Sequence, residues 1–169
     1  IEPWADDKLP VKDGVALWLD AGRIPKARAA LRLPLFRGEG LDVWQDGSGA
    51  RRSVRQMEVA RRPLLEESAG GSALKFDGKD DYLSGQGPNR AVNVTLFVVA
   101  APLTNGGGYR ALASFAEEGL NDYRTGLNVD LGQQGGVTLH SINVEGTGAI
   151  GAAQNLLKTQ FDLGTFHVF

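Results

Sequence analysis

The chain of 169 residues contains no cysteine and only two histidines. The lack of cysteine excludes disulfide bonds, thiolate metal sites, iron–sulfur clusters and a cysteine nucleophile. The longest apolar run, residues 94–103, is shorter than the roughly 18 residues that indicate a membrane-spanning helix. An excess of charge is also lacking, because 18 Lys and Arg residues balance 20 Asp and Glu residues. We therefore expect no nucleic-acid partner and no membrane span in this segment.

Glycine is abundant, at 23 residues, and the chain carries no heptads or helical repeat. This composition favours an all-β domain with many tight turns. Alternating or β-rich patterns predict strands at residues 15–20, 41–45, 92–101, 109–116, 124–131, 136–144 and 164–169. Within residues 136–144 the apolar positions change parity, which predicts a bulge or twist near His140. Residues 92–101, the most apolar of these runs, are expected to form a central strand.

Two segments depart from the strand pattern. Residues 25–33 have a spacing that predicts one short amphipathic helix, and Pro34 is expected to end it. Residues 152–157 can form a helical turn. The two prolines in residues 1–13 indicate an extended N-terminal arm, so we expect an arm over 1–13 and one domain over 14–169.

Residues 74–83 form a distinctive motif, with two short strand-like runs on either side of Asp77-Gly78. Glycine accepts positive φ, and aspartate hydrogen-bonds nearby backbone N–H groups, so this dipeptide can reverse the chain. We expect a hairpin here, with Phe76 in the core. Trp18 and Trp44 occupy strand positions in earlier segments and are also predicted to lie in the core.

Five short motifs in order make the chain resemble the LamG-like jelly rolls of the concanavalin A-like lectin/glucanase superfamily. They are LWLDA at residues 17–21, a W-x-D-x-S-G turn at 44–49, Arg62-Pro63, F-D-G-x-D-D-Y-L at 76–83 and FVV at 97–99. The departures are a longer insertion over residues 22–40 and the absence of the final third of such a domain.

This resemblance implies an antiparallel β-sandwich of the jelly-roll type that is incomplete at its C-terminal end. The chain begins at Ile rather than Met and stops inside an apolar run, so we expect a segment of a larger exported protein. An extracellular, periplasmic or cell-surface location follows from that expectation. The implied function is a non-catalytic module that binds a glycan or an adjoining protein domain.

Catalysis was weighed against this interpretation, because glycoside hydrolases of the same superfamily use two spaced carboxylates. The pairs Glu66-Glu67 and Glu117-Glu118 are adjacent, so their side chains would point to opposite sides of a strand. His140 and His167 belong to no recognisable catalytic or zinc pattern. We therefore expect no enzyme activity. A hydrolase-related enzyme of the same superfamily and a structural spacer packed on a catalytic or electron-transfer domain stay as alternatives.

Calcium is the one cofactor that the sequence raises. Asp77, Asp80 and Asp81 are clustered carboxylates, which are typical calcium ligands. Against this, six or more oxygen atoms are needed and only three are local, so we favour a turn in which Asp77 and Asp80 hydrogen-bond their own backbone and Asp81 faces solvent. Oxygen ligands from elsewhere could complete such a site, from Asn121 and Asp122 or from Asp42 and Asp46.

Four residues are candidates for contact with a ligand. Trp4 lies in the arm, where it either fastens the arm or stacks on a sugar ring. Tyr109, Tyr123 and Arg124 flank glycine-rich loops and are predicted to form a ligand-facing rim. A third group has the appearance of an anion patch, but the balanced local charge favours a solvated loop or contacts to an adjoining domain; it comprises Arg51, Arg52, Arg55, Arg61 and Arg62.

Overall fold

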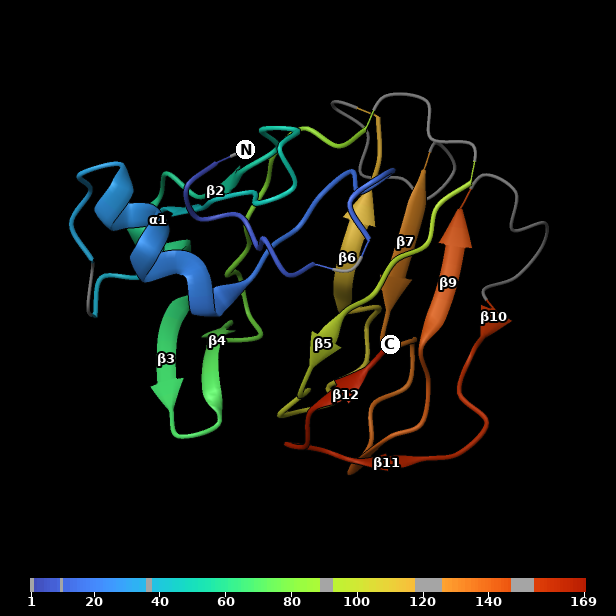
Figure 1. Cartoon of the computed structure of the whole chain (residues 1–169). Coiled ribbons are helices and arrows are strands. Elements are labelled where there is room, and N and C mark those ends of the chain that lie inside the picture. Colours follow the sequence, from blue (N-terminus) through green and yellow to red (C-terminus); the bar gives the residue numbers. More distant parts are fainter. Residues whose placement is uncertain (1, 10, 36–37, 89–92, 118–125, 147–153) are drawn as a thin grey trace. The chain divides into compact units, whose positions relative to one another are not determined.

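The computed structural model of the protein describes residues 2–9, 11–35, 38–88, 93–117, 126–146 and 154–169. The chain divides into two compact units, Ile1–Ala91 and Val92–Phe169 (Figure 1). The boundary falls inside residues 14–169, for which the sequence predicts one domain. Within the described residues, no helix combines the length and apolar character that crossing a lipid bilayer requires.

The first unit contains the predicted helix. The 3-10 helix η1 (Ala21–Arg23) leads directly into α1 (Ile24–Ala30), which carries proline in its first turn. The helix ends before Pro34, because Arg32 adopts a left-handed conformation (φ 55°) and the Leu33 N–H bonds back to the Arg28 carbonyl at 2.8 Å. The helix prediction is thus confirmed, with its end set by Arg32 rather than by the proline.

The strands of the first unit form two small antiparallel pairs. Strand β1 (Val43–Trp44) pairs with β2 (Val54–Arg55), and β3 (Leu64–Ser68) pairs with β4 (Gly71–Lys75) in a hairpin drawn in green in Figure 1. The 3-10 helix η2 (Val59–Arg61) connects the two pairs. The prediction of a strand over residues 41–45 is confirmed for its central two residues.

The hairpin predicted over residues 74–83 is wrong. Leu74 pairs with Leu65 on β3, so β4 takes its partner from the preceding segment. On the other side of the turn, the Tyr82 N–H donates to the Arg61 carbonyl at 3.2 Å. Phe76 is 42% exposed and lies outside the core. Strand β3 lies just across a two-residue turn, at Ala69-Gly70, and this proximity made it the stronger partner for β4.

Residues 15–20 are not a strand, although the sequence predicts one. Their backbone groups are bound by side chains and a turn instead of a ladder. The Trp18 N–H donates to the Asp46 carboxylate at 3.0 Å, and the Ala16 carbonyl accepts from the Arg52 guanidinium at 2.8 Å. These residues have a pattern typical of a strand, but they form an irregular segment because side chains satisfy their backbone polar groups.

The core of the first unit lies between α1 and the β3–β4 hairpin. Ala21, Ile24 and Leu41 are buried, and Trp44, Leu65 and Leu74 pack against them. Arg28 is also buried (1% exposed), although the helical pattern places it among the polar positions. Its guanidinium contacts the Asp42 carboxylate at 2.5 Å and the Pro34 carbonyl, which offsets the cost of burying its charge.

The largest sheet lies in the second unit. Its antiparallel strands run in the order β10-β9-β7-β6, as Figure 1 shows. They are β6 (Ala111–Phe115), β7 (Leu127–Asp130), β9 (Asn143–Gly146) and β10 (Gln154–Asn155). The strands predicted over residues 109–116 and 124–131 are confirmed in their described parts. The helical turn predicted over 152–157 is wrong at Gln154 and Asn155, which form an edge strand against β9.

The pairing register gives this sheet one apolar and one polar face. Val129 pairs with Ala113 and with Val144 across the sheet, and these residues share the face that adjoins the core. The opposite parity is entirely polar on β7 and β9, with the members Asn128, Asp130, Asn143 and Glu145. Leu139 and Ile142 complete the buried cluster of this unit together with Val129 and Leu131.

Two further pairs extend the second unit. Strand β8 (Thr138–Leu139) pairs with β11 (Phe161–Asp162), and β5 (Val99–Ala100) pairs with β12 (His167–Val168). The parity change predicted near His140 marks the point where β8 ends and the chain enters a different sheet at β9. It is a break between strands, not a bulge within one.

Residues 92–101 were predicted to form a central strand, but β5 has only β12 as a neighbour among the described residues. Next to this pair, Val98 and Phe169 exchange two backbone hydrogen bonds of 2.8 Å, and Phe169 packs against the core. Phe97, Val99 and Val168 are 76%, 66% and 70% exposed. The apolar run predicted to form a central strand therefore forms only a two-residue edge strand, because apolar character alone does not determine which strands pair with it.

The fold is therefore mostly β, with small antiparallel sheets and one short α-helix. The all-antiparallel expectation is confirmed for the described strands. A closed sandwich or jelly roll is not formed by those strands, which belong to five separate sheets.

The different positions of Ile24 and Phe76 give a direct test of the first unit. Ile24 is 1% exposed, so Ile24→Ala should lower the free energy of unfolding by about 2–5 kcal/mol. Phe76→Ala should cost about 1 kcal/mol or less. All three tryptophans lie in this unit, so fluorescence during urea unfolding reports on it selectively. Equal losses for the two variants would place Phe76 in the core after all.

Candidate functional site

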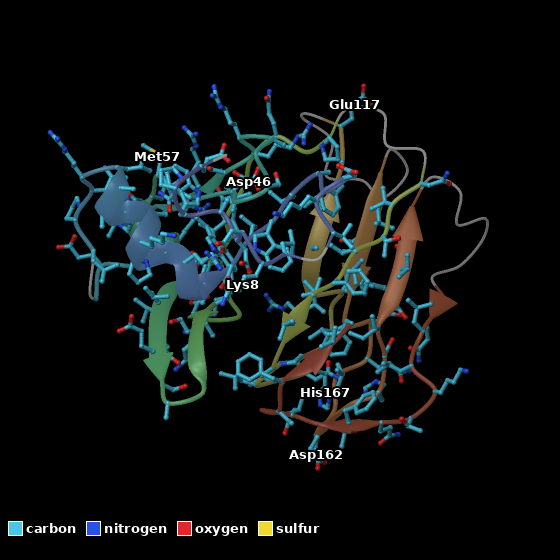
Figure 2. All side chains as sticks on the ribbon, viewed as in Figure 1. Lys8, Asp46, Met57, Glu117, Asp162 and His167 are labelled. Atoms are coloured by element: carbon cyan, nitrogen blue, oxygen red, sulfur yellow. The ribbon has the colours of Figure 1, made fainter. Side chains whose placement is uncertain are left out.

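One carboxylate organises the irregular part of the first unit. Asp46 is 1% exposed (labelled in Figure 2), and its two oxygen atoms accept four hydrogen bonds. Oδ1 accepts from the N–H groups of Trp18 (3.0 Å) and Ser48 (2.8 Å). Oδ2 accepts from the Ser48 hydroxyl (2.7 Å) and the Arg52 N–H (2.9 Å). Asp46 thereby holds together two segments that are far apart in the sequence.

These bonds set the acidity of Asp46. Burial opposes ionisation and by itself raises the pKa of this carboxyl group. The N–H groups of Arg52, Trp18 and Ser48, together with the Ser48 hydroxyl, favour the charged form and outweigh burial. The pKa of Asp46 therefore lies below its usual value of 3.8, and the group is an anion at neutral pH whose lone pairs are used within the fold.

The N-terminal arm is fastened to this arrangement. The Trp4 indole N–H donates to the Asp46 carbonyl at 3.0 Å, and the Arg23 guanidinium donates to the Ala5 carbonyl at 3.0 Å. Arg23 also forms an ion pair with Asp6 at 2.7 Å. Residues 2–9 follow turns rather than the extended path predicted for residues 1–13, because these contacts draw the arm onto the first unit.

An open hollow of about 340 Å³ lies beside the fastened arm; its lining consists of Glu2, Trp4, Asp46, Arg51 and Ser53. We call it the Trp4 hollow. Glu2 approaches the Asp46–Gly49 turn, where a Cβ at Gly49 would lie 3.8 Å from Glu2 Oε2. That oxygen is buried and has no hydrogen-bond partner among the described residues. A buried acceptor without a donor is costly, so it marks a place for a ligand or a water molecule.

The hollow also offers hydrogen-bond donors. The Ser53 hydroxyl accepts from the Asp46 N–H at 3.1 Å, and its own proton has no partner among the described residues. The Arg51 side chain is exposed, and Arg51 adopts a left-handed backbone conformation with φ 59°. Residues other than glycine rarely adopt this conformation, and when they do the position is often functional.

The arginines that have the appearance of an anion patch in the sequence are largely engaged by the fold. Arg52 and Arg62 donate to backbone carbonyl groups at 2.8 and 3.0 Å, and Arg61 forms an ion pair with Glu58 at 3.2 Å. Of the five arginines, Arg51 and Arg55 have side chains with no hydrogen-bond or ion-pair partner among the described residues. The five arginines therefore do not form a continuous anion-binding surface. Arg51 is the one of them that lines the hollow.

The three clustered aspartates do lie together. Carboxylate oxygens of Asp77, Asp80 and Asp81 are all within 4.8 Å of one another. However, Asp77 Oδ1 accepts from the N–H groups of Lys79 (2.8 Å), Asp80 (3.2 Å) and Asp81 (3.3 Å), and Asp81 Oδ2 accepts from the Asp77 N–H at 2.9 Å. The cluster therefore builds its own turn, in which Gly78 has φ 73°.

Electrostatics agree with this structural role. The hydrogen bond from the Lys79 N–H is the main cause that lowers the pKa of Asp77 below 3.8, with smaller help from the Asp81 and Asp80 N–H groups. Asp42 and Asp46, considered as additional calcium ligands, are bound to Arg28 and to the network described above. Asn121 and Asp122 lie outside the described residues.

The predicted rim is described at one of its three positions. Tyr109 belongs to the second unit, is 47% exposed and has φ 56°. Its N–H donates to the Gly132 carbonyl at 2.9 Å, which fastens the glycine-rich loop. Tyr123 and Arg124 lie outside the described residues. Trp4 is a member of the first unit, where it both fastens the arm and lines the hollow.

The remaining candidates for chemistry have structural surroundings. Glu66 pairs with Lys75 at 3.0 Å, and successive residues of β3 face opposite sides, as predicted for Glu66-Glu67. His140 contacts the Thr138 carbonyl at 3.3 Å. His167 (labelled in Figure 2) stacks against Phe161, with ring centroids 4.5 Å apart.

A buried polar network in the second unit escaped the sequence analysis. Asp130 is fully buried and accepts from Asn128 Nδ2 and from the Gly132 N–H, both at 2.7 Å, and from Asn143 Nδ2 at 3.5 Å. Ser141 donates to Asn143 Oδ1 at 2.7 Å. The alternation of polar residues on β7 and β9 was the available signal. Its members satisfy one another, so the network braces the sheet.

No protein-family model, curated protein sequence or solved structure matches this chain.

The Asp46 network predicts a specific pH dependence. A carboxylate whose pKa is lowered on folding contributes stability above pH 3.8, and that stability is lost as the pH falls through the folded-state pKa. Asp46→Asn should reduce the free energy of unfolding at pH 7 by about 2 kcal/mol, because the amide NH2 that replaces one carboxylate oxygen cannot accept from the donors bonded there. It should also flatten the loss of stability below pH 4 in urea titrations followed by tryptophan fluorescence.

Asp77→Asn is the matched control, because Asp77 is an exposed turn aspartate whose pKa is also lowered. It should remove only its own smaller part of the pH dependence. An Asp46→Asn variant with unchanged stability at pH 7 would contradict the organising role of this carboxylate.

The aspartate cluster predicts little response to calcium. Addition of millimolar Ca²⁺ should leave the urea midpoint of the chain unchanged, since a ligand stabilises only the state that binds it. Isothermal titration with Ca²⁺ provides an independent measurement. A rise in the midpoint that Asp81→Asn abolishes would instead establish the calcium site.

Proposed function

We propose that this chain is a non-catalytic carbohydrate-binding module and that its ligand binds in the Trp4 hollow. The observation that carries the proposal is the unpartnered, buried Oε2 atom of Glu2 in a hollow lined by a tryptophan. Sugars present hydroxyl donors beside apolar C–H faces, and a carboxylate beside an aromatic ring complements both.

The position of Trp4 supports this function. Its N–H is bonded to the Asp46 carbonyl at 3.0 Å, so the ring is fixed before a ligand arrives. A rigid aromatic anchor loses little conformational entropy on binding. The two roles weighed from the sequence, fastening the arm and stacking on a sugar ring, are therefore compatible, because the first uses the indole N–H and the second uses the ring.

The same hollow argues for binding rather than hydrolysis. Glycoside hydrolysis needs two carboxyl groups that act on one bond. Asp46 has four hydrogen bonds on its two oxygens, so Glu2 is the carboxylate in the hollow that is free to contact a ligand. A single acceptor can orient a sugar but does not supply the acid and base pair.

We also infer that the small antiparallel sheets belong to a LamG-like jelly roll of the concanavalin A-like superfamily. The order of the five motifs supports this inference, as does the antiparallel pairing of the described strands. Such modules bind glycans or adjoining domains in exported proteins, so the proposed setting is extracellular, periplasmic or on the cell surface.

Replacement of Trp4 tests the function directly. In a screen of a broad glycan and polysaccharide panel, with and without Ca²⁺, the chain should be retained by at least one member. Trp4→Ala should weaken that binding by about 2 kcal/mol, roughly thirtyfold in Kd, as for a tryptophan anchor. Trp4→Phe keeps a ring but removes the N–H, and should retain part of the affinity.

Phe76→Ala is the control for the loss of an aromatic side chain, since Phe76 is exposed in the same unit and does not line the hollow. It should bind as the unchanged chain does. Absence of retention on the whole panel would refute carbohydrate binding, and release of reducing sugar would refute the non-catalytic assignment.

A further inference from the structure

We propose that the Trp4 hollow selects acidic sugars, in which a uronate carboxylate binds Arg51 while ring hydroxyls donate to Glu2. This assignment rests on the proposed function and names its ligand class. The chain would then bind uronate-containing polysaccharides in preference to neutral glucans.

The first step of the argument is the charge in the hollow. Glu2 and Arg51 line the same space and carry opposite charges, yet they form no ion pair with each other. Among the described residues, neither side chain has another charged partner. A ligand that fills the hollow therefore meets an acceptor and a cation that are both available, at no cost in broken protein contacts.

The second step is the choice of ligand group for each charge. The buried Glu2 oxygen needs a donor, and a sugar hydroxyl supplies one without adding charge. The exposed guanidinium binds a carboxylate through two parallel N–H bonds, which a neutral hydroxyl cannot reproduce. A uronate ring carries both groups, separated across the ring, so its carboxylate need not approach Glu2.

The third step concerns the backbone of Arg51. A φ of 59° is readily adopted by glycine and is strained for arginine. A glycine at position 51 would adopt this φ with less strain, and the Arg51 side chain has no hydrogen-bond or ion-pair partner among the described residues, so the fold itself gives no reason for a long cationic side chain here. A contact made by the guanidinium outside the fold accounts for it.

The test compares charged and uncharged forms of the same sugar. Oligogalacturonate and oligomannuronate, and their methyl esters of equal length, are titrated into the chain by calorimetry. At least one acid form should bind about tenfold more tightly than its ester, and this preference should weaken as salt is added. Arg51→Gln should remove the preference by weakening the acid form to about the affinity of its ester.

The control variants separate a specific contact from general attraction. Arg55→Gln removes the same charge from another exposed arginine outside the hollow and should leave the preference intact. Arg51→Lys keeps the charge without the planar fork and should restore only part of it. Glu2→Gln should weaken acid and ester forms alike, and Glu39→Gln, an exposed carboxylate elsewhere, should weaken neither.

The outcomes distinguish this inference from the function beneath it. If esters or neutral glycans bind as tightly as the acids, and Trp4→Ala still abolishes binding, the module binds carbohydrate and the acidic preference is wrong. An equal effect of Arg55→Gln and Arg51→Gln would also overturn it, in favour of nonspecific charge attraction. If no glycan of the panel binds, both proposals fall.

Discussion

The Asp46 carboxylate is the interaction on which the first unit depends. Strands here are only two to five residues long, so ladders account for little of the backbone bonding. Asp46 replaces them by accepting from segments around residues 18, 48 and 52, while its own N–H and carbonyl bind Ser53 and Trp4. A side chain that satisfies so many backbone donors converts irregular loops into a defined surface. Of the residues that line the hollow, Trp4 and Ser53 are bonded directly to Asp46.

Local patterns predicted the elements whose cause is local. The helix follows from spacing and capping within ten residues, and β6 and β7 follow from alternation that their own core face enforces. Residues 15–20 and 74–83 were mispredicted for different reasons. The backbone of residues 15–20 is bound by Asp46, a distant acceptor that a run of β-type residues does not reveal. In residues 74–83 the competitor is local, because β3 lies just across a two-residue turn from β4 and takes its backbone hydrogen bonds.

The sequence predicted only some residues of the candidate site, and the reasons are physical. The sequence indicated Trp4, because this tryptophan lies in a proline-containing arm and not in a predicted strand, where burial in a core would account for it. Glu2 could not be singled out, since an acidic residue near a terminus is ordinarily solvated, and its significance comes from the burial of one oxygen over the turn at residues 46–49. The sequence indicated the aspartates at positions 77, 80 and 81 as possible calcium ligands, but oxygens of Asp77 and Asp81 accept hydrogen bonds within their own turn.

The carboxylates of this chain differ in how far the fold engages them. Asp46 and Asp130 are buried acids whose bonds are complete, and replacing either would damage the fold first. Glu2 and Arg51 lie beside the same framework with opposite charges that the fold leaves uncombined. An ion pair on an exposed side chain adds little to stability, so the fold gains little by joining Glu2 to Arg51, and both groups stay available to the ligand proposed above.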